Sequence, residues 1–124
     1  MKTLTKAEEQ VMHILWDIKK GFVNDVINQI PEPKPAYNTV STIIRILETK
    51  GFIGHKPYGK THEYFPIITK EEYSSKTLNN FISNYFDNSY KDLVSFFSKQ
   101  ENISVKELEE IKKIIEEELK NKEL

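Results

Sequence analysis

The most informative part of this chain is Tyr37-Asn-Thr-Val-Ser-Thr-Ile-Ile-Arg-Ile-Leu-Glu-Thr-Lys-Gly51. Its apolar residues recur at the spacing of one helical face and are Tyr37, Val40, Ile43, Ile44 and Leu47. The opposite face has short hydroxyl and amide side chains with one arginine, namely Asn38, Ser41, Thr42, Arg45 and Thr49. A solvated helix normally presents long glutamate and lysine side chains there, whereas short polar groups can approach base edges closely. The pattern predicts a helix that contacts the major groove of DNA.

The composition is that of a folded chain with the length of one domain, or of a small domain plus an appendage. It has 124 residues, of which 30% are charged and 38% hydrophobic, and it contains no cysteine. No apolar run approaches the roughly 20 residues that a membrane span needs, and the first residues lack the apolar core of a secretory signal. We therefore expect a cytoplasmic protein without membrane insertion. The lack of cysteine excludes disulfides, thiolate metal sites and a cysteine nucleophile.

The formal net charge of −1 conceals a basic segment. Between residues 34 and 62 the only acidic residue is Glu48, and the basic residues are Lys34, Arg45, Lys50, Lys56 and Lys60. A polyanionic partner would meet a local basic surface there, which the charge of the whole chain does not reveal.

The elements around this stretch predict a mainly α-helical chain with a small β-hairpin. Thr5 and Glu8 have the spacing of a capping box, which favours a helix over residues 6–20, and a shorter helix is expected over 23–30. The proline-rich residues 31–35 form an extended connector. After Gly51 the apolar period falls to about two, which predicts a hairpin with a turn at residues 57–60. This order indicates a winged helix-turn-helix domain for DNA binding over residues 1–68.

Residues 69–124 are expected to form a helical dimerisation region. Their amphipathic helices, two of which start at capping boxes, have no globular core of their own to cover. They would expose more apolar surface than monomers usually do, so we predict a two-fold symmetric homodimer. The residues assigned to its seam are Tyr73, Leu78, Phe81, Ile82, Tyr85, Phe86, Leu93, Phe97, Leu108, Ile111 and Ile115. The alternative use of these aromatic rings is a pocket for a small aromatic ligand.

The candidate DNA-binding residues form two groups. Lys34, Asn38, Thr39, Ser41, Thr42 and Arg45 lie on or just before the central helix, and Lys56, Lys60 and His62 lie on the hairpin. Arg45 suits guanine and Asn38 suits adenine, whereas the hairpin residues would reach a flanking phosphate or the minor groove. The plainer interpretation of either group is a solvated surface.

Other kinds of site have little support. His55, His62 and Glu63 show no ligand spacing typical of a metal site, and no cofactor is expected. No catalytic constellation stands in a convincing context, so an enzyme is disfavoured. The competing class is a winged-helix module for protein interactions, because the fold alone does not determine function.

Three stretches show a family resemblance. Residues 4–16, Leu-Thr-Lys-Ala-Glu-Glu-Gln-Val-Met-His-Ile-Leu-Trp, are similar to the pattern Leu-Thr-x-Ala-Glu-x-x-Val-Met-x-x-Leu-Trp, and residues 59–66 are similar to Gly-Arg-x-x-x-Tyr-x-Pro. With the helix over residues 37–51, they resemble the BlaI/MecI/CopY family of penicillinase-type transcriptional repressors. The resemblance implies a dimeric winged-helix repressor of palindromic operators, often those of antibiotic-resistance genes. It also implies that repression ends when a membrane-bound sensor protease triggers cleavage in the dimerisation region.

The chain departs from the family's pattern at several positions. The family usually has arginine where this chain has Ile46 and Lys60. Its penicillinase repressors are cleaved between Asn and Phe, whereas the corresponding pair here is Ser95-Phe96, which makes cleavage at this bond a hypothesis. Copper-responsive members have a cysteine-rich C-terminus, so a chain without cysteine does not resemble that branch.

Overall fold

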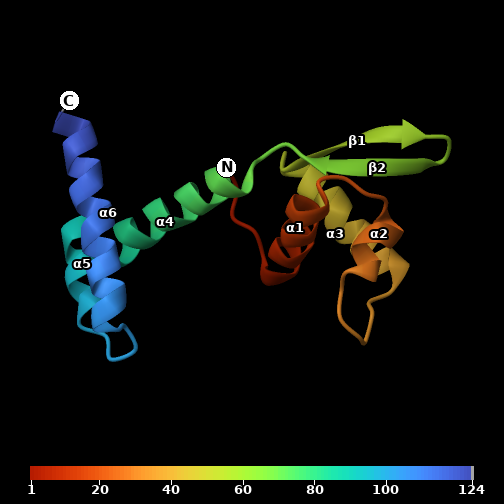
Figure 1. Ribbon diagram of the computed structural model, residues 1–124. Helices are drawn as coiled ribbons and strands as arrows, with labels where there is room; N and C mark the ends of the chain where they lie inside the picture. The colour runs from red at the N-terminus through yellow and green to blue at the C-terminus, as the bar shows by residue number, and fades with distance from the viewer. Residues whose placement is uncertain (124) are drawn as a thin grey trace. The chain divides into compact units, whose positions relative to one another are not determined.

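A computed structural model describes residues 1–123 and shows six helices and one two-stranded antiparallel sheet in that range (Figure 1). The elements are α1 (Lys6–Ile18), α2 (Val23–Asn28), α3 (Tyr37–Thr49), β1 (Ile53–Tyr58), β2 (Thr61–Pro66), α4 (Lys70–Phe86), α5 (Tyr90–Ser98) and α6 (Val105–Glu123). Three helices followed by a hairpin and further helices confirm the predicted fold class. Within residues 1–123 no helix is both long and apolar enough to cross a membrane.

The chain divides into two compact units, one of residues 1–77 and one that begins at Leu78. The sequence predicts a boundary after residue 68. The first unit extends further because Tyr73, in the first turn of α4, packs against its core. Helix α4 therefore contributes residues to both units.

The helices begin at the capping residues that the sequence indicates. Thr5 Oγ1 accepts a hydrogen bond from the Glu8 amide at 3.2 Å, and Glu8 Oε1 accepts one from the Thr5 amide at 3.1 Å. Thr69 and Glu72 make the same reciprocal pair at α4, at 3.0 and 3.3 Å. At α6, Ser104 Oγ accepts from the amide three residues on at 3.1 Å. These bonds satisfy amides that the first turn of a helix leaves free.

The core of the first unit lies between α1, α2, α3 and the hairpin. Its most deeply buried side chains are Val11, Met12, Leu15, Val26, Val40, Ile44, Leu47, Phe52 and Ile53. Burying a side chain of this kind contributes about 1.5–3 kcal/mol relative to leaving it in water. The α3 members of this set lie on one stripe, so the other face of α3 points away from the core.

The hairpin is fixed both in register and in position. Its strands pair from Ile53 opposite Pro66 to Tyr58 opposite Thr61, so the turn is tighter than the sequence predicted. The peptide of Gly21, between α1 and α2, exchanges two hydrogen bonds with that of Tyr64, at 2.9 and 2.8 Å. These bonds anchor β2 to the turn between the first two helices.

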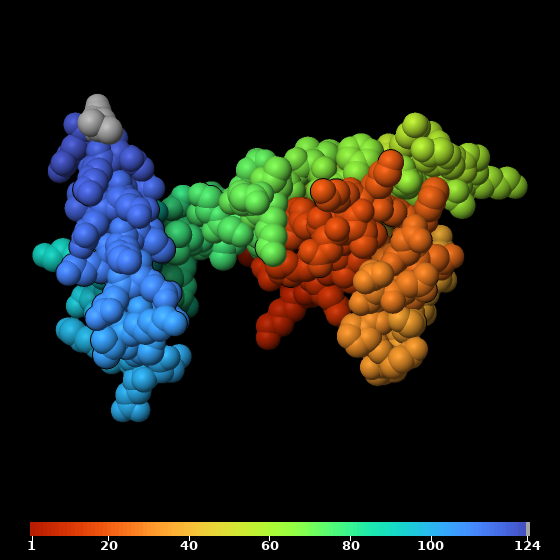
Figure 2. Space-filling view, viewed as in Figure 1, coloured from red at the N-terminus to blue at the C-terminus, as the bar shows by residue number. Residues whose placement is uncertain are grey.

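The second unit buries far less. Ile82 of α4 is 1% exposed, and the Phe86 ring lies 5.7 Å from Phe81 and 5.5 Å from Phe96. Helices α5 and α6 have no buried residue in the described chain. Large apolar side chains exposed in this unit are Leu78, Phe81, Tyr85, Tyr90, Val94, Phe96, Val105, Ile114, Ile115 and Leu119. Figure 2 shows the outer surface that α6, in blue, contributes to this unit.

Candidate nucleic-acid interface

The polar face of α3 is exposed along its length. Asn38, Thr39, Thr42 and Arg45 are exposed and Ser41 is half-buried, whereas the apolar stripe of the same helix faces the core. This arrangement follows from the helical period. Each residue turns about 100° from the one before, so the spacing of the apolar residues places them on one side of α3 and the polar residues on the other. The structure thus places five predicted contact residues on one outward surface.

Two hydrogen bonds within α3 orient the side chains of Thr42 and Arg45. Thr42 Oγ1 donates to the Asn38 carbonyl at 2.8 Å, and Arg45 Nη2 donates to Thr42 Oγ1 at 3.4 Å. The guanidinium has five N–H donors in a rigid fork, so most of them are left for another acceptor. An orientation of this kind suits an arginine that binds a planar, bidentate acceptor.

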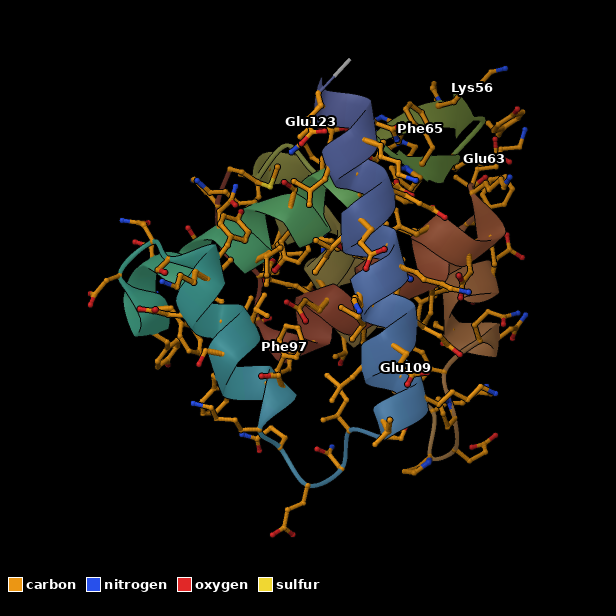
Figure 3. The ribbon with its side chains drawn as sticks, turned by 60° about the vertical axis from the view of Figure 1, so that its left-hand side comes forward. Lys56, Glu63, Phe65, Phe97, Glu109 and Glu123 are labelled. Carbon is orange, nitrogen blue, oxygen red and sulfur yellow. The ribbon has the colours of Figure 1, made fainter. Side chains whose placement is uncertain are left out.

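The hairpin presents Lys56, Lys60 and His62 at the surface. Lys56 extends outward from the hairpin in Figure 3, and its Nζ lies 5.3 Å from the centroid of the Tyr58 ring. The Tyr58 ring in turn lies 5.8 Å from that of Phe22, next to α2. The contact between Tyr58 and Phe22 packs the end of β1 against the residue before α2.

The two hairpin histidines stack on one another, an arrangement that their spacing in the sequence does not indicate. The rings of His55 and His62 lie 4.1 Å apart with an interplanar angle of 4°, and His55 Nδ1 contacts Glu48 of α3. The register explains the stack, because His55 pairs with Tyr64 and its diagonal neighbour is His62. Within residues 1–123 no group of three His, Asp or Glu side chains is arranged to hold a metal ion.

A cavity brings the two groups of predicted residues together. It has a volume of about 480 Å³ and lies between α2, the first turns of α3 and the hairpin. Its lining includes Ser41 of α3 together with Lys60 and His62 of the hairpin. Tyr37, which the sequence placed on the apolar stripe, also lines it and is 50% exposed. The sequence gives one indication that Tyr37 is exposed: it is the first residue of α3, and the residues of this helix that are buried in the core begin at Val40.

Two basic residues are engaged within the first unit. Lys34 Nζ donates to the carbonyls of Ile27, Asn28 and Ile30 at 3.2, 3.3 and 2.7 Å, which uses its three donors at the end of α2. Lys34 is exposed, and its assignment to the DNA-binding group stays a prediction. Lys50, which the charge count included, forms an ion pair with Glu8 at 2.6 Å. The local basic surface therefore depends on Arg45, Lys56 and Lys60.

The ion pair affects how Glu8 titrates. Burial of this side chain, which is 6% exposed, would raise its pKa. The hydrogen bonds from Lys50 and Thr5 outweigh that effect, and the pKa of Glu8 lies below its ordinary value of 4.5. The carboxylate is therefore charged at neutral pH and holds Lys50, at the end of α3, against α1.

The predicted dimer residues differ in their surroundings. Tyr73 is partly buried against the core of the first unit and Ile82 is buried in the second, so within one copy of the chain these two residues already have packing partners. Leu78, Phe81, Tyr85 and Ile115 are exposed, whereas Phe86, Leu93, Phe97, Leu108 and Ile111 are half-buried. Of the candidate cleavage pair, Ser95 is exposed and Phe96 is 56% exposed on α5.

At Ile46 the family resemblance expected an arginine. The side chain is 40% exposed, so this position of α3 does reach the surface, but with an apolar group. Any contact that the chain makes there with DNA cannot be a charged one.

The similarity of this chain to known proteins includes residues of both units. Residues 4–117 match the family model described as penicillinase repressor. The chain is 32% identical over 113 residues to the methicillin resistance regulatory protein MecI of Staphylococcus aureus strain N315, covering 90% of this chain and 92% of that protein. It is 24% identical over 115 residues to a penicillinase repressor of Bacillus licheniformis, covering 92% and 90%.

The solved structure of a related domain agrees with the fold of the first unit. The solution structure of the DNA-binding domain of the repressor BlaI matches with a TM-score of 0.50 and 27% identity, covering 59% of this chain and 94% of that domain. The similarity in sequence thus extends through the C-terminal helices, whereas the similarity to this structure covers about the length of the winged-helix part.

Proposed function

The chain belongs to the penicillinase repressor family, and from its exposed surfaces we propose that it binds a palindromic operator as a homodimer. As a member it is a DNA-binding transcriptional repressor and not an enzyme. The family thereby decides against the alternative of a protein-interaction module. A repressor has to reach its DNA, so we also propose a cytoplasmic location.

The observation that supports the DNA-binding mode is the outward polar face of α3 beside the hairpin. We propose that α3 enters the major groove, where Arg45 binds guanine O6 and N7 and Asn38 binds adenine N6 and N7. Lys60 and His62 lie across the cavity from Ser41 and are near enough to α3 to contact a flanking phosphate. Thr39 and Thr42 would contact a phosphate or a thymine methyl group.

The observation that supports the homodimer is the apolar face of α6. Ile111, Ile115 and Leu119 recur at a spacing of four residues, and the last two are 45% and 55% exposed. A second copy of this chain would cover such a face through a two-fold interface. Tethering two winged-helix units would raise the effective concentration of the second to about the millimolar range and strengthen binding by about 10²- to 10⁴-fold.

The dimer also offers a way to relieve repression. We propose that a sensor protease triggers cleavage of the Ser95–Phe96 bond, which lies on an exposed helix of nine residues without a buried side chain. A segment with so few buried contacts opens locally at low cost, as a protease requires. Cleavage there would separate α6 from the winged-helix unit and leave every base contact intact. Mass spectrometry of the chain from induced cells should find a fragment that begins at Phe96; an intact chain would reject this route.

The repressor itself is tested by a gel shift against the DNA upstream of the chain's own gene, followed by footprinting. We expect retardation of that DNA at concentrations about 10³-fold or more below those for unrelated DNA. A strong decrease in affinity with salt should accompany it, because lysine and arginine contacts release counterions. Equal affinity for all sequences would contradict an operator upstream of this gene.

A further inference from the structure

Ile46 is an isoleucine of α3 that remains open to solvent. Ile44 is fully buried and Ile43 packs against the core, whereas Ile46 is 40% exposed. Each helical residue turns about 100° from the one before, so Ile46 lies within about 40° of both Thr39 and Thr42 around the helix. An apolar side chain therefore interrupts the polar surface that we propose faces DNA.

The exposed threonines on this side of α3 have hydroxyl groups that are already engaged. Thr42 Oγ1 donates to the Asn38 carbonyl at 2.8 Å and accepts from Arg45 Nη2 at 3.4 Å. Thr49 Oγ1 donates to the Arg45 carbonyl at 3.0 Å. A threonine hydroxyl has one hydrogen to donate, so both donors are used within the helix. Neither hydroxyl is free to donate to a base, whereas the methyl group on the same carbon stays available for contact.

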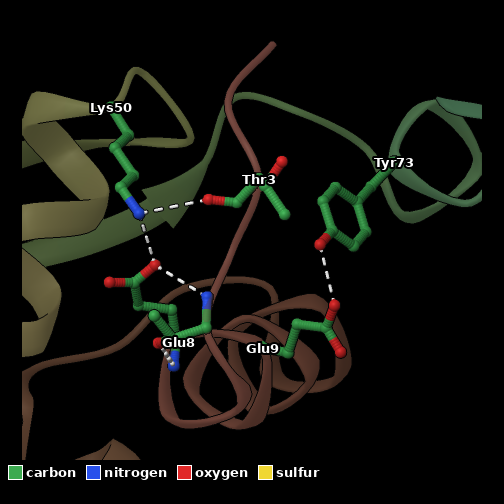
Figure 4. Close-up of polar contacts among 6 residues, drawn as sticks. Thr3, Glu8, Glu9, Lys50 and Tyr73 are labelled. Atoms are coloured by element: carbon green, nitrogen blue, oxygen red, sulfur yellow. Dashed lines mark hydrogen bonds and ion pairs between the residues drawn. The ribbon is translucent and has the colours of Figure 1, made fainter. Parts of the chain in front are cut away.

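Lys50 follows Ile46 by one turn, but its charge is bound to another element. Its amide donates to the Ile46 carbonyl at 2.9 Å. Its Nζ donates to Glu8 Oε1 of α1 at 2.6 Å and to the Thr3 carbonyl at 3.2 Å (Figure 4). A phosphate at Ile46 would gain little from this ammonium, because Glu8 already pairs with it. The surroundings of Ile46 thus favour an apolar partner over a phosphate.

The major groove of DNA offers such a partner in the C5-methyl group of thymine. The other base edges present hydrogen-bond donors and acceptors, which lose water at a cost if an isoleucine covers them. A thymine methyl group makes no hydrogen bond and gains from burial against another apolar group. Ile46 and the Thr42 methyl group therefore match thymine by their chemistry.

We propose that Ile46, with the Thr42 methyl group beside it, binds the C5-methyl group of a thymine and so helps to determine the operator sequence. The inference rests on the proposed placement of α3 in the major groove and does not depend on the dimer. It adds to the DNA-binding group a residue that the polar pattern of α3 does not include.

Replacing thymine by uracil in the operator tests this contact directly. Uracil presents the same hydrogen-bonding groups and pairs with adenine, so the exchange removes only the methyl group. Footprinting locates the operator, and each thymine of one half-site is then exchanged in turn. For the unaltered chain we expect at least one exchange to lower affinity about fourfold, which is the effect of burying one methyl-sized group.

Matched substitutions identify the residues that contact this methyl group. Ile46→Ala removes most of the apolar side chain but keeps a strong helix former, and Ile46→Val keeps the branched apolar shape. Thr42→Ser removes the methyl group and keeps the hydroxyl, whereas Thr42→Val keeps a methyl group and removes the hydroxyl. The two pairs separate apolar contact from hydrogen bonding at both positions.

We expect Ile46→Ala to lower the preference for thymine over uracil to below about twofold, and Thr42→Ser to lower it in part. Both valine variants should keep a preference of about fourfold, whatever their overall affinity. Ile67→Ala trims another exposed isoleucine, which lies outside α3, and should change neither affinity nor preference. The preference is a ratio measured on one protein, so a change in stability does not alter it.

Two results would overturn the inference and leave the proposed function intact. One is a specific operator whose affinity no exchange of thymine for uracil lowers, including an operator without thymine in its protected half-sites. The other is a preference for thymine that persists unchanged in Ile46→Ala. If the unaltered chain binds all DNA sequences alike, the proposed function fails and the inference fails with it.

Discussion

The two units of this chain use their apolar side chains in opposite ways. The first encloses a core of thirteen buried hydrophobic residues among three helices and a hairpin, whereas in the described part of the second only Ile82 is comparably buried. A unit with its own core can hold a polar surface rigidly enough to contact base edges. A unit that leaves its isoleucines and phenylalanines exposed is better explained by pairing with a second copy. We therefore assign DNA recognition to the first unit and dimer assembly to the second.

The largest change in operator affinity is expected for a substitution in the second unit. Ile115→Asp places a charge on the apolar face of α6, so we expect dimers to separate and operator affinity to fall by about 10²- to 10⁴-fold. Sedimentation and gel shifts measure the two effects. Lys113→Asp, on the opposite face of α6, is the control and should leave both unchanged. A stable dimer in Ile115→Asp would place the interface elsewhere.

On the recognition side, Arg45→Ala tests the polar face of α3. Loss of a bidentate contact with guanine should cost about 1–3 kcal/mol, or about 5- to 150-fold in affinity for the operator. Gel shifts against operator and unrelated DNA should show a smaller loss for the latter. Lys6→Ala removes an exposed charge from α1 and serves as the control. If operator and unrelated DNA weaken alike, Arg45 contacts phosphate and not a base.

The stability of the first unit should depend on Glu8. Its pKa is lowered in the folded state, so it stabilises the fold above its unfolded value near 4.5, and this contribution is lost as the pH falls through the folded pKa. Glu8→Gln should lower the free energy of unfolding by about 1–3 kcal/mol at pH 7 and by less at pH 3. Urea titrations at both pH values measure this, with Asp17→Asn on the same helix as the control. An equal cost at both pH values would show that the charge of Glu8 is immaterial.

The smallest effect is expected on the hairpin. Lys60→Ala should weaken binding to all DNA sequences alike and reduce the salt dependence of affinity by about one unit in slope. Titrations at several salt concentrations measure the slope. An unchanged slope would remove Lys60 from the interface and leave the cavity beside it without a role in binding phosphate.

Local patterns were sufficient to predict the elements of this fold. The helix over residues 37–49 follows from its apolar period, and α1 and α4 begin at reciprocal capping pairs that the sequence shows directly. The hairpin follows from a change of period after Gly51. Each of these patterns involves residues close together in the chain, so each can be recognised in a single sequence.

Contacts between distant residues could not be predicted in this way. The hydroxyl of Tyr73 meets Glu9 across 64 residues of chain, so its apolar spacing alone assigned it to a dimer seam. The sequence shows Lys34 only as a basic residue, because only the fold brings its ammonium to the carbonyls that end α2. The stack of His55 on His62 depends on the strand register, which the turn at Gly59 sets.

If one unit contacts a half-site and the other pairs two copies of the chain, both should be visible in one experiment. That experiment is a hydroxyl-radical footprint of the full chain on its operator, with the stoichiometry of the complex measured on the same sample. We expect two chains per operator and two protected stretches on one face of the duplex, about one or two turns apart. A single protected half-site with one chain bound would contradict it.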